Sequence, residues 1–474
     1  MRKMSVQMSM YDTYTDVSSA MENEKSKFIQ MLEEHIKFEE LIPYDFYHAF
    51  YRRYGRPRDY PLEGFMRFFV LQKILGIIYD STLLTILTLC KELREFCGFE
   101  KVPDASKITR FRQDFVGYIE MMFNKLVALT EPICREIDAK KADYLIYDPT
   151  GISAYVSENN PKFLNARLVQ AKKLSKKNPQ LQPHSLAYSL MPECAGANPF
   201  VKQQYINGHF CYAHKAGVLT NGIGVVRGIS FFDDRFKRKH PEVLSQKTDN
   251  PDTDKEIGDS SSLRPVLSDF FKTHPTFSYK TFLADASFDS YDNYSMLRNE
   301  FHFDRIAIPL NLRNSGGAHG DFDENGTPVC PIDKTPFTFI GTCGGENRSM
   351  RFKWVCHNSV RRGSKRVCVC DNPCTTSSYG RCVYTYPDKN LRLYPGIPRG
   401  TQHWDNLYRY RVLVERNIHS LKNTLGSDYR KSFSSRTAKA DLFLAGITQL
   451  IGVILAKAFS KLHLAISVRK LLSA

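Results

Sequence analysis

The stretch from Asp405 to Leu425, DNLYRYRVLVERNIHSLKNTL, constrains the fold most strongly because it predicts one long helix with two distinct faces. Asp405 and Asn406 are favourable N-cap residues, and no Gly or Pro interrupts the run before Gly426. Each residue of a helix advances about 100° around the axis, so regular spacing sorts side chains into stripes. One stripe is apolar and predicts docking on a hydrophobic core. It contains Leu407, Val414, Ile418, Leu421 and Leu425.

A second stripe of the same helix carries polar and charged residues in the pattern Tyr-x2-Arg-x3-Glu-x6-Lys. Tyr408, Arg411, Glu415 and Lys422 together span about 60° beside the apolar stripe, and His419 lies at its edge. Any one of these residues alone is well explained by a solvated charged face. A carboxylate at the rim of a core has cations as its natural partners, however, so the four residues together indicate a functional site.

The charge of the chain indicates a polyanionic partner. Among its 474 residues, 42% are hydrophobic and 24% charged, which is ordinary for a globular protein, but the net charge is +16. Such an excess favours nucleic acid or an anionic membrane surface. The N-terminus lacks the apolar core of a signal peptide, and the longest apolar run, Leu442–Ala456, is too short and too polar to span a membrane. We therefore expect a buried helix there, no membrane partner, and a cytoplasmic, nucleoid-associated protein.

Five segments are predicted along the chain. Residues 1–25 are polar and predict a disordered tail, and residues 26–140 predict an all-α domain. Residues 141–310 predict the first part of an α/β catalytic domain, residues 311–403 a Cys- and Arg-rich insertion domain, and residues 404–474 the catalytic helix and C-terminal helices that complete the core. N-terminal helices are expected at Lys27–Glu40, Leu62–Tyr79, Thr82–Phe96 and Ser106–Ile137, with Asp104 and Ser106 as caps of the last.

Basic residues are concentrated in three of these regions. Residues 155–200 are expected to form a long irregular insertion, in which Pro161–Gln180 carries six Lys or Arg and no acid. This run is either a solvated loop or an arm that follows phosphates. The run from Arg351 to Cys370 is also basic without an acid. In the all-α domain several cations could neutralise phosphates, although a helical packing domain without DNA contact is the alternative. They are Arg52, Arg53, Arg56, Arg110 and Arg112.

Two aspartates follow predicted strands. Asp148 ends the β-prone run from Asp143, which is closed by Pro149 and Gly151, and Asp285 follows the strand Tyr279–Ala284. An Asp at the tip of a strand that opens a βα unit is where open α/β sheets place their ligands. A turn or helix cap is the alternative for each Asp alone.

Asp148, Asp285 and Glu415 lie far apart in sequence, so only the fold could bring them together. Three close carboxylates repel one another and are tolerated when cations neutralise them. An all-oxygen site suits Mg²⁺ or Mn²⁺, and two such ions about 3.5–4 Å apart would support phosphoryl transfer. Seven of the twelve cysteines lie between Cys330 and Cys382, but they lack the paired C-x2-C spacing of a zinc site. Structural zinc is therefore the less favoured alternative to reduced core cysteines.

The stripe of Tyr408, Arg411, Glu415 and Lys422 resembles the YREK signature of DDE transposases encoded by bacterial insertion sequences. Leu93–Phe115 is similar to the closing segment of the helical domain that precedes the catalytic core of many such enzymes. The resemblance implies an RNase H-like core in which Glu415 is the third metal-binding carboxylate, and it associates the Tyr, Arg and Lys with phosphates at the transposon end. Trp404 could stack on a displaced base, or it could be a buried anchor at a domain junction.

The fold expected is therefore α/β: an RNase H-like mixed-sheet catalytic domain with an insertion domain, preceded by an all-α domain. The function expected is a DDE transposase that cleaves at its element's ends and joins them to target DNA. The resemblance implies double-stranded DNA partners, namely terminal inverted repeats and target DNA, and a homodimer on DNA. The alternatives are a domesticated DNA-binding protein, a metal-dependent nuclease without joining activity, and a zinc-bearing interaction module.

Overall fold

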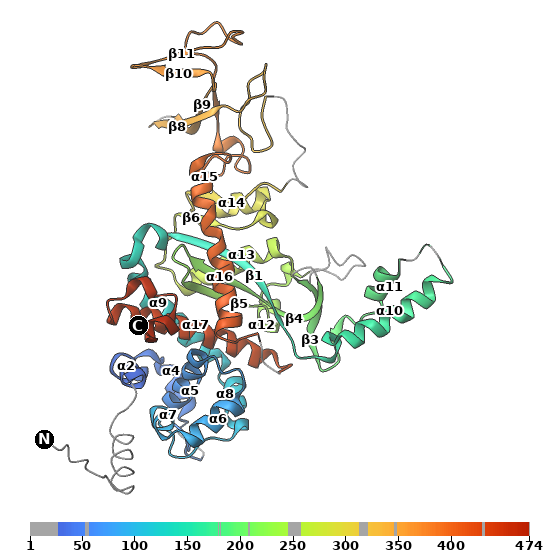
Figure 1. Ribbon diagram of the computed structural model, residues 1–474, viewed down its shortest axis with the longest axis vertical. Helices are drawn as coiled ribbons and strands as arrows, with labels where there is room; N and C mark the ends of the chain where they lie inside the picture. The colour runs from blue at the N-terminus through green and yellow to red at the C-terminus, as the bar shows by residue number, and fades with distance from the viewer. Residues whose placement is uncertain are drawn as a thin grey trace, which may run out of the picture. The chain divides into compact units, whose positions relative to one another are not determined.

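The computed structural model describes residues 27–52, 56–178, 180, 182–206, 209–244, 257–311, 321–345, 348–428 and 432–473 (Figure 1). The chain forms two compact units. Unit 1 comprises Met1–Ile133, Leu421–Arg430 and Arg436–Ala474, and unit 2 comprises Cys134–Ser420 and Lys431–Ser435. The predicted tail, residues 1–25, lies outside the described residues. The prediction of a helical N-terminal region and a mixed α/β remainder is confirmed.

Unit 2 is built on a mixed sheet whose central strand is β1 (Tyr144–Ser153). On one side β1 pairs antiparallel with β4 (His209–Asn221), and on the other it pairs parallel with β6 (Thr281–Leu283). The sheet continues in parallel from β6 to β7 (Arg305–Ala307). β1 is longer than the predicted strand, which was expected to end at Asp148. Its pairing with β6 stops at Ile146, so the proline that follows Asp148 interrupts no ladder on that side.

The far edge of β4 carries two further strands, β5 (Val226–Phe231) and β3 (Asn198–Ile206), and β3 in turn pairs with β2 (Cys194–Ala195). β4 and β5 form a hairpin whose turn lies at residues 221–225. The Asn221 side chain stabilises this turn, because its Oδ1 accepts hydrogen bonds from the N–H groups of Ile223 and Val225 at 3.1 and 3.0 Å.

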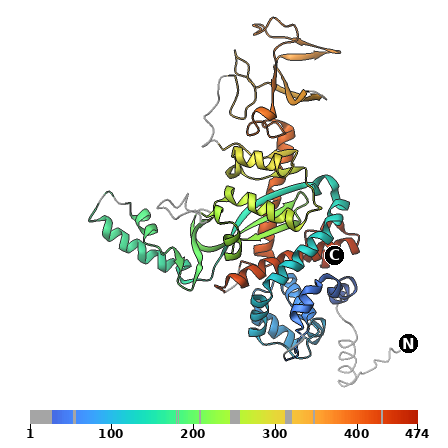
Figure 2. The same ribbon diagram turned by 180° about the vertical axis from the view of Figure 1, so that it is seen from behind.

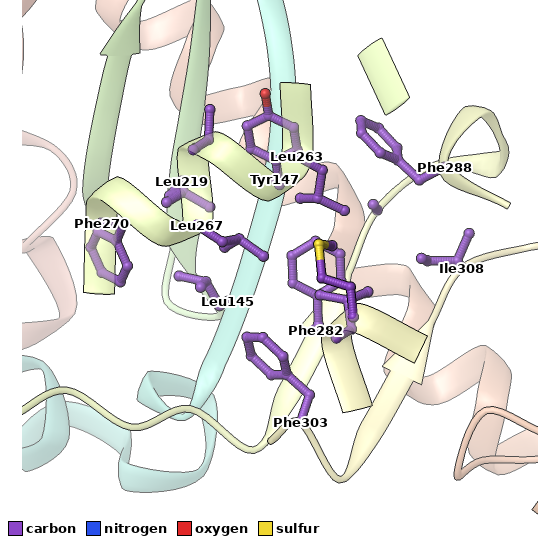
Figure 3. Packing of buried hydrophobic residues seen from close by; sticks show 14 of the residues in the cluster. Leu145, Tyr147, Leu219, Leu263, Leu267, Phe270, Phe282, Phe288, Phe303 and Ile308 are labelled. Carbon is purple, nitrogen blue, oxygen red and sulfur yellow. The ribbon is translucent and has the colours of Figure 1, made fainter. Parts of the chain in front are cut away.

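Helices lie on both faces of this sheet. α13 (Asp259–Thr273) and α14 (Tyr291–Asn299) bury a hydrophobic cluster against one face, which includes Leu145 and Tyr147 of β1 (Figure 3). α16 (Val412–His419) packs against β1 and β4. It crosses in front of β1 in Figure 1 and passes behind the sheet in Figure 2. Side chains alternate along a strand, so Asp148 points away from the cluster of Tyr147 and toward the side of α16.

Residues 155–200 were expected to be irregular, but they contain two helices. α10 (Pro161–Ser175) and α11 (Pro183–Ser189) pack against each other, and a third helix, α12 (Asp234–Lys239), follows β5. α10 begins with a strong start signal, since the Asn160 side chain accepts a hydrogen bond from the N–H of Lys162 and Pro161 occupies the first turn. The high charge of this segment obscured that signal.

The insertion holds short strands around its own small core. β12 (Cys382–Thr385), β9 (Arg348–Val355) and β8 (Thr338–Gly345) form a three-stranded sheet, and β10 (Ser359–Arg362) pairs with β11 (Lys365–Cys368). Trp354 is buried at the centre, and its Nε1–H donates to Thr385 Oγ1 at 2.9 Å. A buried indole with its polar group satisfied stabilises a sheet of this size.

Unit 1 is helical. The predicted helical segments are present but more divided than expected, and Asp104 caps α8 as predicted, accepting from the N–H of Ser106 at 2.8 Å. The helices are α2 (Lys27–His35), α3 (Phe38–Leu41), α4 (Tyr44–Phe50), α5 (Leu62–Leu75), α6 (Asp80–Leu89), α7 (Lys91–Phe96), α8 (Ala105–Asp114), α9 (Val116–Ala142, which runs on into unit 2), α17 (Ser435–Ala458) and α18 (Val468–Ser473).

α17 confirms the predicted buried helix. The whole helix is longer than the apolar run Leu442–Ala456 and, contrary to expectation, is long and apolar enough to cross a membrane. However, 94% of its most apolar window is buried inside the protein, which is typical of a core helix. A charged residue, Asp441, lies in its second turn with no exposed surface. Its carboxylate is 3.2 Å from Arg112 Nε and 3.6 Å from Lys73 Nζ, and Arg112 also contacts Asp80 at 2.7 Å. The expectation that Arg112 contacts phosphates is wrong, because the side chain is 1% exposed and fixed in these ion pairs.

We expect Asp441→Ala to destabilise the protein by about 3–5 kcal/mol, because it leaves Lys73 and Arg112 buried without their shared carboxylate. Urea denaturation measures this loss. The control is Glu95→Ala, which removes an exposed pair with Lys91 and should cost less than about 1 kcal/mol. Equal losses for the two variants would contradict a stabilising role for the buried ion pairs.

Candidate active site

Asp148 and Asp285 lie side by side because of the parallel register of β1 and β6. The register pairs Ile146 with Leu283, and each aspartate lies two residues further along its own strand direction. Both side chains are therefore at the same level of the sheet. Asp148 is 17% exposed and Asp285 is 40% exposed. Their neighbouring positions follow from the strand pairing and are not predictable from the sequence alone.

Asp285 acts as a cap and also faces the site. It is the N-cap of a 3-10 turn (Ala286–Phe288), and its Oδ1 accepts hydrogen bonds from the N–H of Ser287 at 2.8 Å and from the hydroxyl of the same residue. Its Oδ2 is 3.5 Å from Arg411 Nη2. The cap alternative and the site prediction are thus compatible, since each uses a different oxygen.

The signature residues lie on helices that begin earlier than expected. α15 (Gln402–Tyr408) is capped by Thr401, whose Oγ1 accepts a hydrogen bond from the N–H of Trp404 at 3.2 Å, and not by Asp405 or Asn406. Both predicted caps lie inside the helix on its exposed side. Thr is also an N-cap residue, so the sequence offered two starts and the structure uses the first.

The helix changes geometry twice along the signature. A 3-10 segment (Arg409–Arg411) joins α15 to α16, and a π-helical turn (Ser420–Thr424) follows α16. Lys422 lies in that turn, in unit 1, where its Nζ is 3.2 Å from Asp428. π-helical turns occur frequently at functional sites. The apolar stripe is confirmed at Leu407, Val414, Leu421 and Leu425, which are all buried, whereas Ile418 is only half-buried.

The guanidinium of Arg411 lies among all three candidate carboxylates. Its Nη2 is 3.2 Å from Asp148 Oδ1 and 3.5 Å from Asp285 Oδ2, and its Nη1 forms an ion pair with Glu415 Oε1. Because one nitrogen contacts both aspartates, the two carboxylate oxygens can be no further apart than the sum of those distances. Two ions about 3.5–4 Å apart, each with ligands at about 2.1 Å, span a similar length.

Negative charge exceeds positive charge at this site. The pKa of Asp148 is raised to about 7: burial is the main cause, Arg411 opposes the rise, and the nearby Asp285, Glu415 and Asp259 add to it. Burial lowers the pKa of Arg411, but the three carboxylates outweigh burial and hold it above its ordinary value. A single guanidinium therefore compensates the carboxylates only in part.

The donor set fits hard divalent cations. Three carboxylates from separate elements offer only oxygen ligands, which Mg²⁺ and Mn²⁺ prefer, and their charge is only partly neutralised. Within the described part of the chain, no group of three or more His, Cys, Asp or Glu side chains is arranged to hold a metal ion as it stands. At the candidate site the arginine occupies that centre. Zinc in the insertion stays a hypothesis.

Trp404 and Tyr408 lie beside the site on α15. Their rings stack with centroids 5.9 Å apart, and burial raises the pKa of Tyr408 to about 12. Trp404 is only 6% exposed and lies under the guanidinium of Arg399, 5.2 Å away. In this conformation its ring has little surface for a displaced base, which accords with the anchor alternative.

Sequence reasoning missed two supporting charges. Asp259, at the first turn of α13, is a fourth carboxylate near Asp148, and Lys215 neutralises it at 2.6 Å. Arg399 is buried and donates to Ile308 O at 2.9 and 2.8 Å and to the Tyr294 hydroxyl at 2.6 Å. It thereby fastens the end of the insertion to the strand end that precedes it. No local pattern distinguishes either residue from a surface charge.

Asp289 has a structural role near the end of the sheet. Its carboxylate accepts hydrogen bonds from Arg392 at 2.6 Å, from the Tyr294 hydroxyl at 3.0 Å and from the N–H of Asn311 at 2.8 Å. Both oxygens of its carboxylate therefore have hydrogen-bond partners within the protein. It has no contact with Arg411, unlike Asp285.

Unit 1 has a cavity of about 250 Å³ with an aromatic floor and a cationic rim. The floor includes Phe50, Phe111 and Phe115, all buried. The rim is exposed and carries Arg56, Arg58, Lys107 and Arg110 together with Asp59 and Asp114, so cations exceed carboxylates there. Within the described residues, Arg58, Lys107 and Arg110 form no ion pair with a carboxylate, so their charge is available to an anion.

We expect Asp148→Asn to stabilise the metal-free protein at pH 8. The folded pKa of about 7 lies above the ordinary 3.8, so the stabilisation from protonated Asp148 is complete below pH 3.8 and lost as pH rises through 7. Above pH 7 the buried charge costs up to about 4 kcal/mol, which Asn avoids.

Thermal unfolding in EDTA between pH 4 and 8 measures this effect. The melting temperature of Asp148→Asn minus that of the wild type should be positive at pH 8 and shrink toward pH 4. Asp405→Asn, on the exposed side of α15, is the control. A difference that does not vary with pH would contradict the raised pKa.

Comparison with known proteins identifies one region. Residues 17–114 match the family described as Transposase domain (DUF772). No curated protein matches the chain. The matched region includes α2 to α8, and it contains most of Leu93–Phe115, the segment whose similarity to transposases was expected. The match places a transposase domain in the N-terminal part of the chain, and such a domain indicates a DNA-processing enzyme that binds DNA.

Proposed function

We propose that this protein is a DDE transposase that cleaves DNA at the ends of its element and transfers them into target DNA. One observation carries the proposal: Asp148, Asp285 and Glu415, from three distant segments, all contact the guanidinium of Arg411. A structural role for each carboxylate alone would not require them to share a centre. The transposase domain at residues 17–114 supports the same function independently.

The topology of unit 2 supports an RNase H-like core. β1 is followed by an antiparallel meander, β4 and β5, and then by the parallel strands β6 and β7. Two carboxylates come from adjacent strands and the third from α16, which is the DDE arrangement that the sequence predicts. The insertion enters after β7 and returns at α15, so it separates Asp285 from Glu415 without disturbing the sheet.

Asp148, Asp285 and Glu415 would hold two Mg²⁺ ions, or two Mn²⁺ ions. When bound, such ions activate water or a DNA 3′-hydroxyl and stabilise the departing oxygen. The sheet holds both aspartates, and the hydrogen bond from the N–H of Ser287 also holds Asp285. Glu415, in contrast, is 55% exposed and free to reorient. Tyr408 and Arg411 lie on the same helical face as Glu415 and would contact a DNA phosphate, Arg411 through two donors at once.

Three basic surfaces would hold duplex DNA. In unit 1 it is the rim of the cavity at Arg58, Lys107 and Arg110. In unit 2 one is the exposed basic face of α10, and another is the ribbon of β10 and β11, where Arg361 faces Arg366 and Arg362 faces Lys365. Like charges directly opposite each other destabilise a ribbon unless a polyanion neutralises them. Transposon terminal repeats and target DNA supply that polyanion, and a homodimer would hold two ends together.

Glu415→Gln is expected to abolish cleavage and strand transfer, by at least about a thousandfold, while leaving DNA affinity intact, because it removes a metal ligand without changing shape. The assay combines purified protein, Mg²⁺, labelled duplex carrying the element's end and supercoiled target plasmid. Asp405→Asn, ten residues earlier on the exposed side of the helix, is the control.

Full joining by Glu415→Gln would refute the proposal. Nicked but never joined product from the wild-type protein would instead identify a metal-dependent nuclease. Binding without any cleavage at authentic ends would leave a DNA-binding protein of transposase descent.

Arg110→Ala and Arg112→Ala should impair different properties, although the residues are nearly adjacent. Arg110 is exposed at the cavity rim, so its loss should weaken DNA binding at unchanged stability. The slope of log K for DNA binding against log[salt] should become less steep by about one. Arg112 is 1% exposed, so its loss should lower stability. Fluorescence anisotropy at several salt concentrations and urea denaturation measure the two effects. Equal DNA affinity for Arg110→Ala and the wild type would exclude the rim as a contact.

A further inference from the structure

The position of Arg411 conflicts with the binding of metal ions by the carboxylates around it. Its guanidinium occupies the centre that two divalent ions would share, with Nη2 against Asp148 and Asp285 and Nη1 against Glu415. Two such ions bring four positive charges to three carboxylates. A guanidinium that remained there would be repelled by the ions and would block their ligands.

We infer that Arg411 is a removable counter-ion: it neutralises the three carboxylates in the metal-free protein, leaves the centre when divalent ions bind, and is thereby released to bind a DNA phosphate. The inference rests on the proposed function, since it requires that Asp148, Asp285 and Glu415 bind metal. It adds a coupling, because metal binding and DNA binding would each favour the other through one side chain.

The contacts of Arg411 suit a residue that is held by charge and can be displaced. Within the described residues its buried Nε–H has no hydrogen-bond acceptor, so the guanidinium is not satisfied at every donor. It is 10% exposed, which keeps its ion pairs effective without enclosing it completely. A guanidinium held mainly by carboxylates loses its position when divalent cations take the same oxygens.

The backbone gives the displaced side chain a direction. Arg411 ends the 3-10 segment (Arg409–Arg411) between α15 and α16, and Tyr408 precedes it by three residues on the same face. A side chain that leaves the carboxylates along this face arrives beside the Tyr408 ring. Its planar fork would there bind a phosphate with two donors, which neither Lys nor Gln could reproduce.

Mn²⁺ binding without DNA tests the first half of the inference. Electron paramagnetic resonance and calorimetry would compare the wild type with Arg411→Gln, Arg411→Lys and Asp285→Asn. Removing the competing charge should make Arg411→Gln bind Mn²⁺ about tenfold more tightly than the wild type, and Arg411→Lys should stay close to the wild type. Without metal, Arg411→Gln should melt at lower temperature, and Mn²⁺ should restore it.

The outcomes separate the inference from the proposed function. If neither the wild type nor Arg411→Gln binds Mn²⁺ more tightly than Asp285→Asn, the carboxylates are not a metal site and the proposed function fails. If Asp285→Asn weakens Mn²⁺ binding but Arg411→Gln also weakens it, the metal site stands and the inference is overturned. Arg411→Lys keeps the test open if Arg411→Gln fails to fold, because a tenfold loss of Mn²⁺ affinity in it would equally overturn the inference.

DNA binding tests the second half. Fluorescence anisotropy would measure the affinity for a 5′-phosphorylated duplex end with and without Ca²⁺, used as a probe ion that permits binding without turnover. We expect Ca²⁺ to tighten binding by about fivefold or more in the wild type and to have little effect in Arg411→Gln and Arg411→Lys. Arg409→Gln, a neighbouring exposed arginine, is the matched control and should keep the Ca²⁺ effect. An equal Ca²⁺ effect in Arg411→Gln and the wild type would overturn the coupling.

Discussion

Compensation of buried negative charge is the constraint on which unit 2 depends. Asp148 is held in a poorly solvated position by a sheet strand, and two further carboxylates and Asp259 surround it. Such a group of charges is unstable without cations, and the fold supplies one guanidinium from the facing helix. The compensation is incomplete, which is a poor solution for stability alone. It accords with the proposal that the site binds divalent cations.

Unit 1 also buries charged residues, but there the ion pairs have a structural role. Asp441, Lys73, Arg112 and Asp80 form ion pairs across four helices, and none of their charge is left for a ligand. The surplus cations of unit 1 are instead at the rim of an aromatic cavity, where no carboxylate pairs with Arg58, Lys107 or Arg110 among the described residues. Burial with complete pairing marks a structural role, whereas incomplete pairing beside open space marks a surface available to an anion.

The candidate site joins rigid and adjustable parts. Asp148 and Asp285 are fixed by the strand register and by the cap at Ser287, and α16 is tied to the sheet by the hydrogen bond from Asn417 Nδ2 to Gly224 O at 2.9 Å. Glu415 and Arg411 are long side chains on that helix and can change partners without moving the backbone. Rigid strands combined with long helical side chains would allow the proposed exchange of the central cation while the two aspartates stay in register.

The sequence by itself determined the residue types and their local placement. Helical periodicity identified the apolar stripe of Leu407, Val414 and Leu421, and β-prone runs placed Asp148 and Asp285 at strands, because both signals are local. The sequence analysis did not predict several features, because it lacked information on long-range contacts. They are the start of α15 after Thr401, the helices within residues 155–200, the burial of Arg112 and the hydrogen bonds of Arg399. Only the tertiary structure decided that Asp148 and Asp285 share one level of the sheet and that Arg411 lies among all three carboxylates. The strand register and the packing of α16 fix these contacts, and no spacing along the chain encodes either.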